Sequence, residues 1–275
     1  MLIAADMQEY LAKHDIVHLS PPLEGWEGFP LGNGSFGGPL WAGVDGLTFQ
    51  ANHTDTYELP DPDDPGEQRA SWMVLRSCGR LTIQHTVPIH EWLYLNDFEA
   101  RLSLGQARAT FMSRNAFGRF ETTAYTHAQR PLAVFHYRAA YAGDLAAAGA
   151  PVRITLERWG SRVCGWWYHH LQGGASFGLG RVQVGVDQAD AWLTASFRGV
   201  DVALRCRVIG APAQVRVNHA HQVEITVDAA PQQDFTILLA CYGLVLAQHA
   251  QQEDLLIATP FANREHAEAV DVLGC

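Results

Sequence analysis

Strict alternation of apolar and polar residues is the feature that most constrains how this chain can fold. In residues 200–208 every even-numbered position is apolar, and three of the odd-numbered positions between the ends are not. Successive side chains of a strand point to opposite faces, so this pattern predicts a strand buried on one face. The same reasoning predicts strands at 182–186 and 223–227, and near 80–87, 91–95, 107–113, 119–126, 132–139, 152–158, 191–197 and 234–241.

These predicted strands are separated by Gly, Pro or Asn and have no helical pattern between them. Many short antiparallel strands without interleaved helices are typical of a β-sandwich. We therefore expect an all-β fold, a large antiparallel two-sheet super-sandwich with short helices at the termini. Residues 1–20 are predicted as an N-terminal helical segment, 21–257 as the sandwich domain and 258–275 as the start of a linker helix with Asn263 as its N-cap.

Composition supports a substantial core and argues against two classes of partner. Hydrophobic residues make up 48% of the 275 positions, enough to bury a large β domain. The 19 basic and 29 acidic residues give a net charge of −10, which disfavours the phosphate backbone of a nucleic acid as partner. No apolar run reaches the roughly 20 residues of a membrane span, so we expect no membrane partner.

The N-terminus and the cysteines suggest where such a chain would fold. Residues 1–14 lack the basic and then apolar layout of a secretory signal. The five cysteines show no C-x-x-C spacing, and an odd count fits a reducing cytoplasm better than a disulfide scaffold. We expect a cytoplasmic protein in which Cys206 and Cys241 are core thiols, because both lie in apolar alternation.

A glycine-dense loop at residues 29–38 leads into a hairpin at 40–49 that turns at Asp45-Gly46. An Asn/Asp/Thr-rich segment follows at 50–57, and a strand that ends in a histidine-containing turn is predicted within 120–134. Together with segments 93–100 and 107–111, these features resemble the N-terminal β-sandwich domain of family 95 glycoside hydrolases, which are α-L-fucosidase-like enzymes. Two departures are Tyr57, where the family usually has tryptophan, and an acidic insertion at 60–67.

This resemblance implies a galactose-mutarotase-like super-sandwich that packs on linker helices and a catalytic (α/α)6 barrel. The family's catalytic carboxylates lie in that barrel, so none is carried over to this sequence. The implied function is that of a non-catalytic sandwich domain with a helical barrel as partner. The alternatives are a free-standing carbohydrate-binding module and a small intact hydrolase, and we also expect a homodimer.

Aromatic and amide side chains beside the glycine loop are the candidates for contact with carbohydrate or with a partner domain. A flat aromatic face can stack on the C–H face of a pyranose, while neighbouring amides and hydroxyls bond its hydroxyl groups. Each also has a structural alternative, because tryptophans pack in cores and Asx side chains brace turns. The candidates are Trp26, Asn33, Trp41, Asn52, His53, Asp55 and Tyr57, with Gly32, Gly34 and Gly37 as loop glycines.

The sequence assigns no catalytic carboxylates and no metal site. Acids fall either in the loop that contains Asp61 and Glu67 or at strand positions expected to be exposed, such as Glu224. His219 and His221 were candidates for one face of a strand, and His169 and His170 adjoin aromatic residues. Neither pair has a third ligand at a diagnostic spacing, so we expect no metal and no cofactor.

Overall fold

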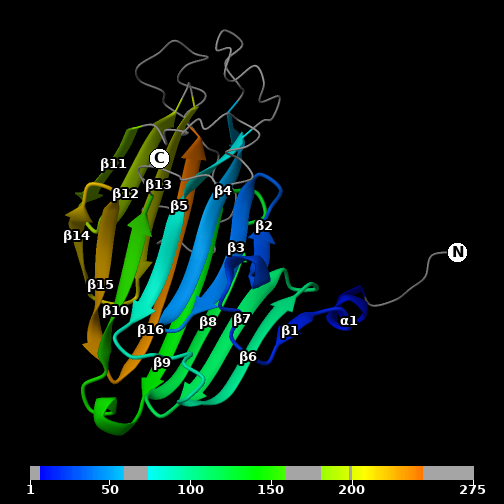
Figure 1. Ribbon diagram of the computed structural model, residues 1–275, viewed down its shortest axis with the longest axis vertical. Helices are drawn as coiled ribbons and strands as arrows, with labels where there is room; N and C mark the ends of the chain where they lie inside the picture. Colours follow the sequence, from blue (N-terminus) through cyan, green and yellow to red (C-terminus); the bar gives the residue numbers. More distant parts are fainter. Residues whose placement is uncertain (1–6, 59–73, 159–180, 198–199, 244–275) are drawn as a thin grey trace, which may run out of the picture.

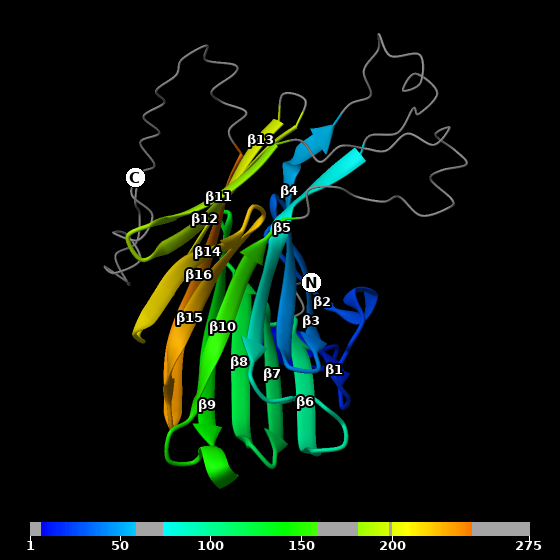
Figure 2. The ribbon, with the colours of Figure 1, turned by 60° about the vertical axis from the view of Figure 1, so that its left-hand side comes forward.

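The computed structural model describes residues 7–58, 74–158, 181–197 and 200–243. Over these residues the chain forms two antiparallel sheets that face each other, as Figures 1 and 2 show from two directions. The prediction of an all-β, two-sheet sandwich is confirmed. The described strands follow one another without a long helix between them, in agreement with the two-residue alternation of the sequence.

The first sheet contains nine strands and runs from the short β1 at one edge to β11 at the other. Its strands, in spatial order, are β1 (Ile16–His18), β6 (Leu95–Ser103), β7 (Arg108–Asn115), β8 (Gly118–Thr126), β9 (Leu132–Tyr141), β16 (Gln232–Gly243), β13 (Val200–Ile209), β12 (Asp190–Phe197) and β11 (Arg181–Asp187).

The second sheet contains seven strands and carries the glycine-dense segment at one edge. Its strands, in spatial order, are β14 (Ala213–His219), β15 (Gln222–Ala230), β10 (Ala150–Glu157), β5 (Val74–His85), β4 (Gly46–Glu58), β3 (Phe36–Gly43) and β2 (Phe29–Gly32).

Helices are short in the described part of the chain. The helix predicted near the N-terminus is present as α1 (Met7–Ala12), while residues 16–18 pair with β6 instead of continuing it. Two 3-10 turns, η1 (Gly25–Glu27) and η2 (Gly143–Leu145), complete the inventory. The predicted linker helix after Asn263 lies outside the described residues. Among those residues no helix is long and apolar enough to cross a membrane.

Two local predictions are wrong. Residues 91–95 were expected to form a strand, but β6 begins at Leu95 and the preceding residues form consecutive turns, with Glu91 N donating to Pro88 O and Tyr94 N to Glu91 O. β14 ends at His219, so His221 lies in a turn and does not share a strand face with it. At residues 88–94 the backbone makes short-range turn hydrogen bonds, and residues 220–221 form the turn of the hairpin in which His219 pairs with Gln222.

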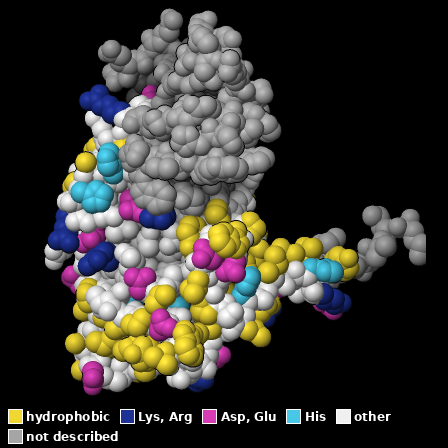
Figure 3. Space-filling model, viewed as in Figure 1, with side chains coloured by type: hydrophobic (Ala, Val, Ile, Leu, Met, Phe, Trp, Pro, Cys, Tyr) yellow, Lys and Arg dark blue, Asp and Glu magenta, His cyan; other side chains and the backbone are white. Residues whose placement is uncertain are grey.

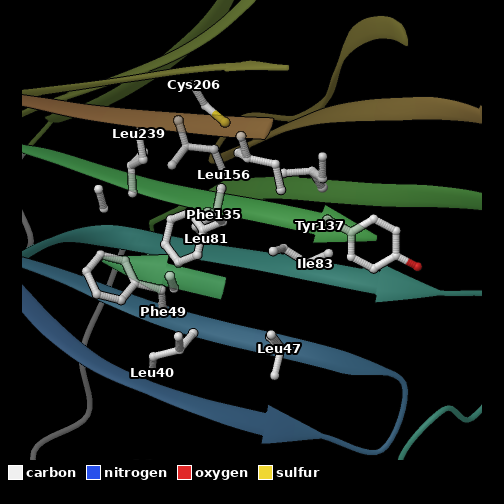
Figure 4. Close-up of a cluster of buried hydrophobic side chains, with 14 of the residues drawn as sticks. Leu40, Leu47, Phe49, Leu81, Ile83, Phe135, Tyr137, Leu156, Cys206 and Leu239 are labelled. Atoms are coloured by element: carbon white, nitrogen blue, oxygen red, sulfur yellow. The ribbon is translucent and has the colours of Figure 1, made fainter. Parts of the chain in front are cut away.

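The core lies between the sheets and is built from the inward positions of the alternating strands. On β13, Val202, Leu204 and Cys206 are all at most 1% exposed. Figure 4 shows Phe49 and Leu81 of one sheet pointing toward Phe135 of the other. Cys206 and Cys241 are buried as predicted.

Candidate functional site

The glycine loop and the Asn-rich segment meet because the chain doubles back at Asp45-Gly46. β3 pairs with β4 in a register that places Gly37 opposite Asn52, and Thr54 N donates to Ser35 O at 2.8 Å. The β2–β3 turn and residues 52–54 therefore line one shallow depression of about 280 Å³. The predicted adjacency of these two segments is correct.

Glycine is required in this loop for two physical reasons. Gly34 has φ +94, a conformation that side chains with a Cβ rarely adopt. A Cβ on Gly37 would lie 2.2 Å from Leu31 O, and one on Gly38 would lie 1.7 Å from Gln50 O. A Cβ on Gly32 would lie 3.4 Å from its nearest atom, Phe36 O, so a side chain would be crowded at this position but not excluded.

The Asn33 side chain fastens the turn between β2 and β3 to the turn between β8 and β9. Its Nδ2 donates to His127 O and to Arg130 O, both at 2.8 Å. Its Oδ1 accepts from Ser35 N at 3.0 Å, Ser35 Oγ at 3.1 Å and Phe36 N at 2.9 Å. Both amide hydrogens and the amide oxygen are engaged by protein, so Asn33 joins the two sheets at this end of the sandwich.

The other polar candidates differ in how far they are exposed. Asn52 projects outward on β4, whereas His53 is buried, since neighbouring strand positions face opposite ways. The His53 Nδ1 accepts from Asp55 N at 3.2 Å, which braces the strand locally. Tyr57 lies on β4, and its side chain is outside the described part of the structure.

The two tryptophan candidates are linked through Gly25, and we call Trp26 and Trp41 the tryptophan platform. Residues 22–28 lie along β3, with Ala42 N donating to Pro22 O at 3.0 Å. Gly25 sits on the ring of Trp41, where an added Cβ would lie 3.8 Å from the ring atoms. Trp26 follows directly and is 83% exposed.

The platform lies on the outer face of the seven-stranded sheet. Figure 3 shows hydrophobic side chains gathered over the region where β3 lies in Figure 1. Trp41 pairs with Thr48 on β4, and Gln50 and Asn52 follow on the same outward face. Asn52 is four residues from Thr48, or about 13 Å along the strand. The platform and the depression are thus neighbours on one face, and not one pocket.

Carboxylates on this outer face are held by arginines. Glu224, expected to be exposed, is 2% exposed because Arg216 and Arg153 from the flanking strands fold over it, with N–O distances of 2.8 and 3.2 Å. Glu157 on the next strand is bonded by Arg80 and by Gln222 Nε2 at 2.8 Å. Neither acid presents a free carboxyl group of the kind that glycoside hydrolysis requires.

Histidines do not assemble a metal site in the part of the chain that is described. No group of three His, Cys, Asp or Glu side chains there could hold a metal ion. His219 Nδ1 instead accepts from His221 N at 3.3 Å. His169 and His170, with the loop that contains Asp61 and Glu67, lie outside the described residues.

One titratable group lies far from the platform, between the sheets. Burial, and to a smaller extent the electrostatic effect of His90, lower the pKa of His85 to about 3. The Tyr137 hydroxyl lies 3.5 Å from His85 Nδ1, and burial raises the pKa of Tyr137. These groups stay neutral at pH 7 and belong to the core.

Sequence reasoning missed the role of the β8–β9 turn. It singled out a histidine-containing turn within 120–134, but not that its carbonyls receive the Asn33 amide. Residues 33 and 127 are 94 positions apart, and only the pairing of the sheets brings them together. The signal available in the sequence was the asparagine between two glycines, which is typical of a braced turn.

Comparisons with known proteins agree with the fold and give no family. No protein-family model matches the chain. A solved structure assigned as a kojibiose phosphorylase from the human microbiome matches 86% of this chain at TM-score 0.51 and 14% identity. The match spans 34% of that protein's chain, about a third of its length. At this identity the likeness shows a shared fold.

A second match is short. Forty residues, 14% of this chain, are 48% identical to part of tyrocidine synthase 3 from Brevibacillus parabrevis. The match spans 1% of that synthase, so it does not assign the chain to a family.

Proposed function

We propose that this chain is a carbohydrate-associated, non-catalytic β-sandwich domain of the type found at the N-terminus of family 95 glycoside hydrolases. The observation that carries the proposal is the tryptophan platform, in which Trp26 is 83% exposed and follows Gly25, the glycine that packs against the Trp41 ring. Exposed flat aromatics beside polar side chains are suited to the alternating C–H and hydroxyl surface of a sugar.

The fold comparison supports the same class. The matched solved structure is named for a sugar-processing activity, and the region matched is a third of that chain. A sandwich of this type would accompany a helical catalytic barrel, as the family 95 resemblance implies. Fold likeness alone does not confer activity, so the proposal rests on the surface.

The arginine pairing of Glu157 and Glu224 supports a non-catalytic role for this face. A glycosidase needs two carboxyl groups that face each other across a cleft, one of them able to donate a proton. Each of these acids is instead bonded to at least one guanidinium. We expect the purified chain to hydrolyse no aryl fucoside or aryl galactoside above the buffer rate.

Glycan binding tests this proposal directly. Affinity electrophoresis in gels containing soluble polysaccharides should retard the chain in at least one gel. The double variant W26A/W41A should migrate as if no polysaccharide were present. The control is Tyr10→Ala, which removes an aromatic side chain that is 53% exposed on α1, outside the platform. Equal retardation of all three proteins would contradict the role of the platform.

A partner-binding role is favoured by a second apolar patch, which consists of Val44, Trp92, Leu93 and Tyr94. His90 N donates to Val44 O at 2.9 Å, so the β3–β4 turn and the β5–β6 connection meet there. All four side chains are more than a third exposed, and Figure 3 shows hydrophobic side chains along this lower part of the molecule. The predicted homodimer or a catalytic barrel would cover this patch.

Oligomeric state distinguishes these partners. If a second copy covers the patch, light scattering at high concentration gives a dimer, and Trp92→Ser gives a monomer. A wild-type chain that stays near its 30.3 kDa monomer mass would argue against the homodimer and leave a different domain as partner.

A further inference from the structure

A hollow of about 770 Å³ lies away from the tryptophan platform, on the nine-stranded sheet. It lies toward the end of the sandwich where β9, β15 and β16 meet, which is the lower end in Figure 2. Its volume falls within the range of roughly 300–1,000 Å³ that is usual for small-ligand sites. The residues that line it play no part in the platform or in the depression beside the glycine loop.

Strand register explains why the sheet surface is hollow at this point. Arg119 on β8 and Gln232 on β16 both pair with Ala140 on β9, so a methyl group lies between two long side chains. In the next row, Glu121 and Asp234 both pair with Arg138. Ala140 is exposed, and it forms a floor with longer polar side chains on three sides.

Small residues from two connections form the remaining wall and keep the hollow open. The β13–β14 connection contributes Ala211 and Pro212, and the end of β15 contributes Ala229 and Ala230. Asp228 N donates to Pro212 O at 3.1 Å, which joins these two segments. The wall is therefore apolar and braced by backbone.

Ion pairs fix the position of some of the charged side chains that line the hollow. Asp234 lies between two basic side chains, with Oδ2 accepting from Arg138 Nε at 3.3 Å and Oδ1 lying 3.3 Å from His136 Nε2. The opposite ring nitrogen of His136 is 3.1 Å from Thr236 Oγ1. Because Arg138 uses its Nε toward Asp234, its terminal nitrogens can point to a ligand.

The hollow is lined by both acidic and basic side chains, and this mixture indicates which class of ligand it can bind. An anionic ligand would be repelled by the carboxylates of Glu121, Asp228 and Asp234. A cationic ligand would be repelled by the guanidinium groups of Arg119 and Arg138. A neutral polyol satisfies both sets, because each hydroxyl can donate to a carboxylate and accept from a guanidinium. The alanines and Pro212 offer an apolar surface to the C–H groups of such a molecule.

We propose that this hollow is a binding pocket for a mono- or disaccharide, separate from the tryptophan platform. The inference deepens the proposed carbohydrate-associated function and rests on it for the class of ligand. We expect the pocket to bind a sugar without hydrolysing it, because Asp234 is paired with Arg138 and His136, and Arg138 lies between Glu121 and Asp234.

Calorimetric titration with D-glucose, D-galactose, L-fucose and kojibiose tests the pocket. At least one of these sugars should bind the wild-type chain. Ala140→Leu fills the floor from an exposed position and should weaken that binding at least tenfold, and Arg119→Ala should do the same. The matched controls are Ala128→Leu and Arg108→Ala, exposed residues outside the pocket, which should bind as the wild type does. Circular dichroism verifies that each variant is folded.

The outcomes separate this inference from the proposed function. Small-sugar binding that survives W26A/W41A and is lost in Ala140→Leu supports the pocket. If W26A/W41A removes small-sugar binding and Ala140→Leu leaves it intact, the pocket is wrong and the platform stands. If the chain binds polysaccharide but none of the four sugars, the pocket alone is overturned. Failure to bind either class of sugar overturns both.

Discussion

Asn33 and Trp26 were both candidates for sugar contact, and the structure places them in opposite situations. The amide of Asn33 makes five hydrogen bonds to protein atoms, two of them across the sheets. Trp26 buries little of its surface and is 83% exposed. A side chain whose hydrogen-bonding capacity is used by its own backbone stabilises the fold, whereas an exposed aromatic face is free to meet a ligand. The turn around Asn33, which we call the structural joint, thus stabilises the fold, and the platform is the better binding surface.

Near the structural joint, the largest loss of stability is expected from Gly38→Ala on β3. The added Cβ would lie 1.7 Å from Gln50 O, so β3 and β4 could not keep their register. We expect little or no soluble folded protein. Gly34→Ala, where φ is +94 but no atom lies within 4 Å of the added Cβ, should cost only about 1–2 kcal/mol. Urea unfolding of Gly34→Ala and an expression test of Gly38→Ala check the order, and equal behaviour would show that the close approach does not matter.

Acid should act on the interior between the sheets and not on the platform. The pKa of His85 is about 3 in the fold and near 6.5 when unfolded, so the neutral form is favoured by folding. Its contribution to stability is complete above pH 6.5 and is lost as pH falls toward 3, at roughly 1.4 kcal/mol per pKa unit.

Replacement of this histidine measures that dependence. His85→Phe should flatten the fall in stability between pH 6.5 and 3. Polysaccharide binding at the platform should persist until the chain unfolds, because neither tryptophan titrates. A slope that His85→Phe does not alter would place the acid-sensitive group elsewhere.

Asn33→Ala tests the structural joint itself. The variant leaves two carbonyls of the β8–β9 turn and two backbone N–H groups without the amide, so we expect a loss of about 2–3 kcal/mol in the free energy of unfolding. Asn52→Ala is the control, since its amide makes one long bond of 3.5 Å to Gln50 O. Its expected cost is under about 1 kcal/mol. Loss of sugar binding in folded Asn33→Ala, with unaltered stability, would reverse the assignment of this residue.

The smallest effect on stability is expected at the platform. Trp26→Ala should change the free energy of unfolding by less than about 0.5 kcal/mol while weakening polysaccharide binding. Trp41→Ala should cost more, because Gly25 packs on its ring. Thermal unfolding and affinity electrophoresis on the same samples give both quantities. A strongly destabilised Trp26→Ala would mean that this ring is part of the fold.

The sequence predicted the strands best where alternation was complete. Residues 200–208 and 223–227 lie within β13 and β15, and the 45–46 turn joins β3 to β4. The strand prediction for residues 91–95 is wrong because these residues follow Pro88 in a series of hydrogen-bonded turns. The edge strand β14 was not predicted, since most of its side chains are exposed and only Val215 packs against the core.

The candidate site was predicted less completely than the fold. The adjacency of the glycine turn and residues 52–54 followed from one hairpin, which is a local feature. The burial of Glu224 did not follow, because it depends on Arg153 and Arg216 from two other strands.

Sequence alone determined the fold class, the inward side of most strands and the turn that needs glycine. These are properties of a strand's two-residue period and of the φ angles a residue allows, and both act over a few neighbouring positions. Tertiary structure alone decided that Asn33 joins two sheets, that Trp26 remains exposed while Gly25 packs against Trp41, and that Ala140 forms the floor of a hollow. Each depends on strands paired across long sequence separations, where the partner of a side chain is set by the packing of the whole sandwich.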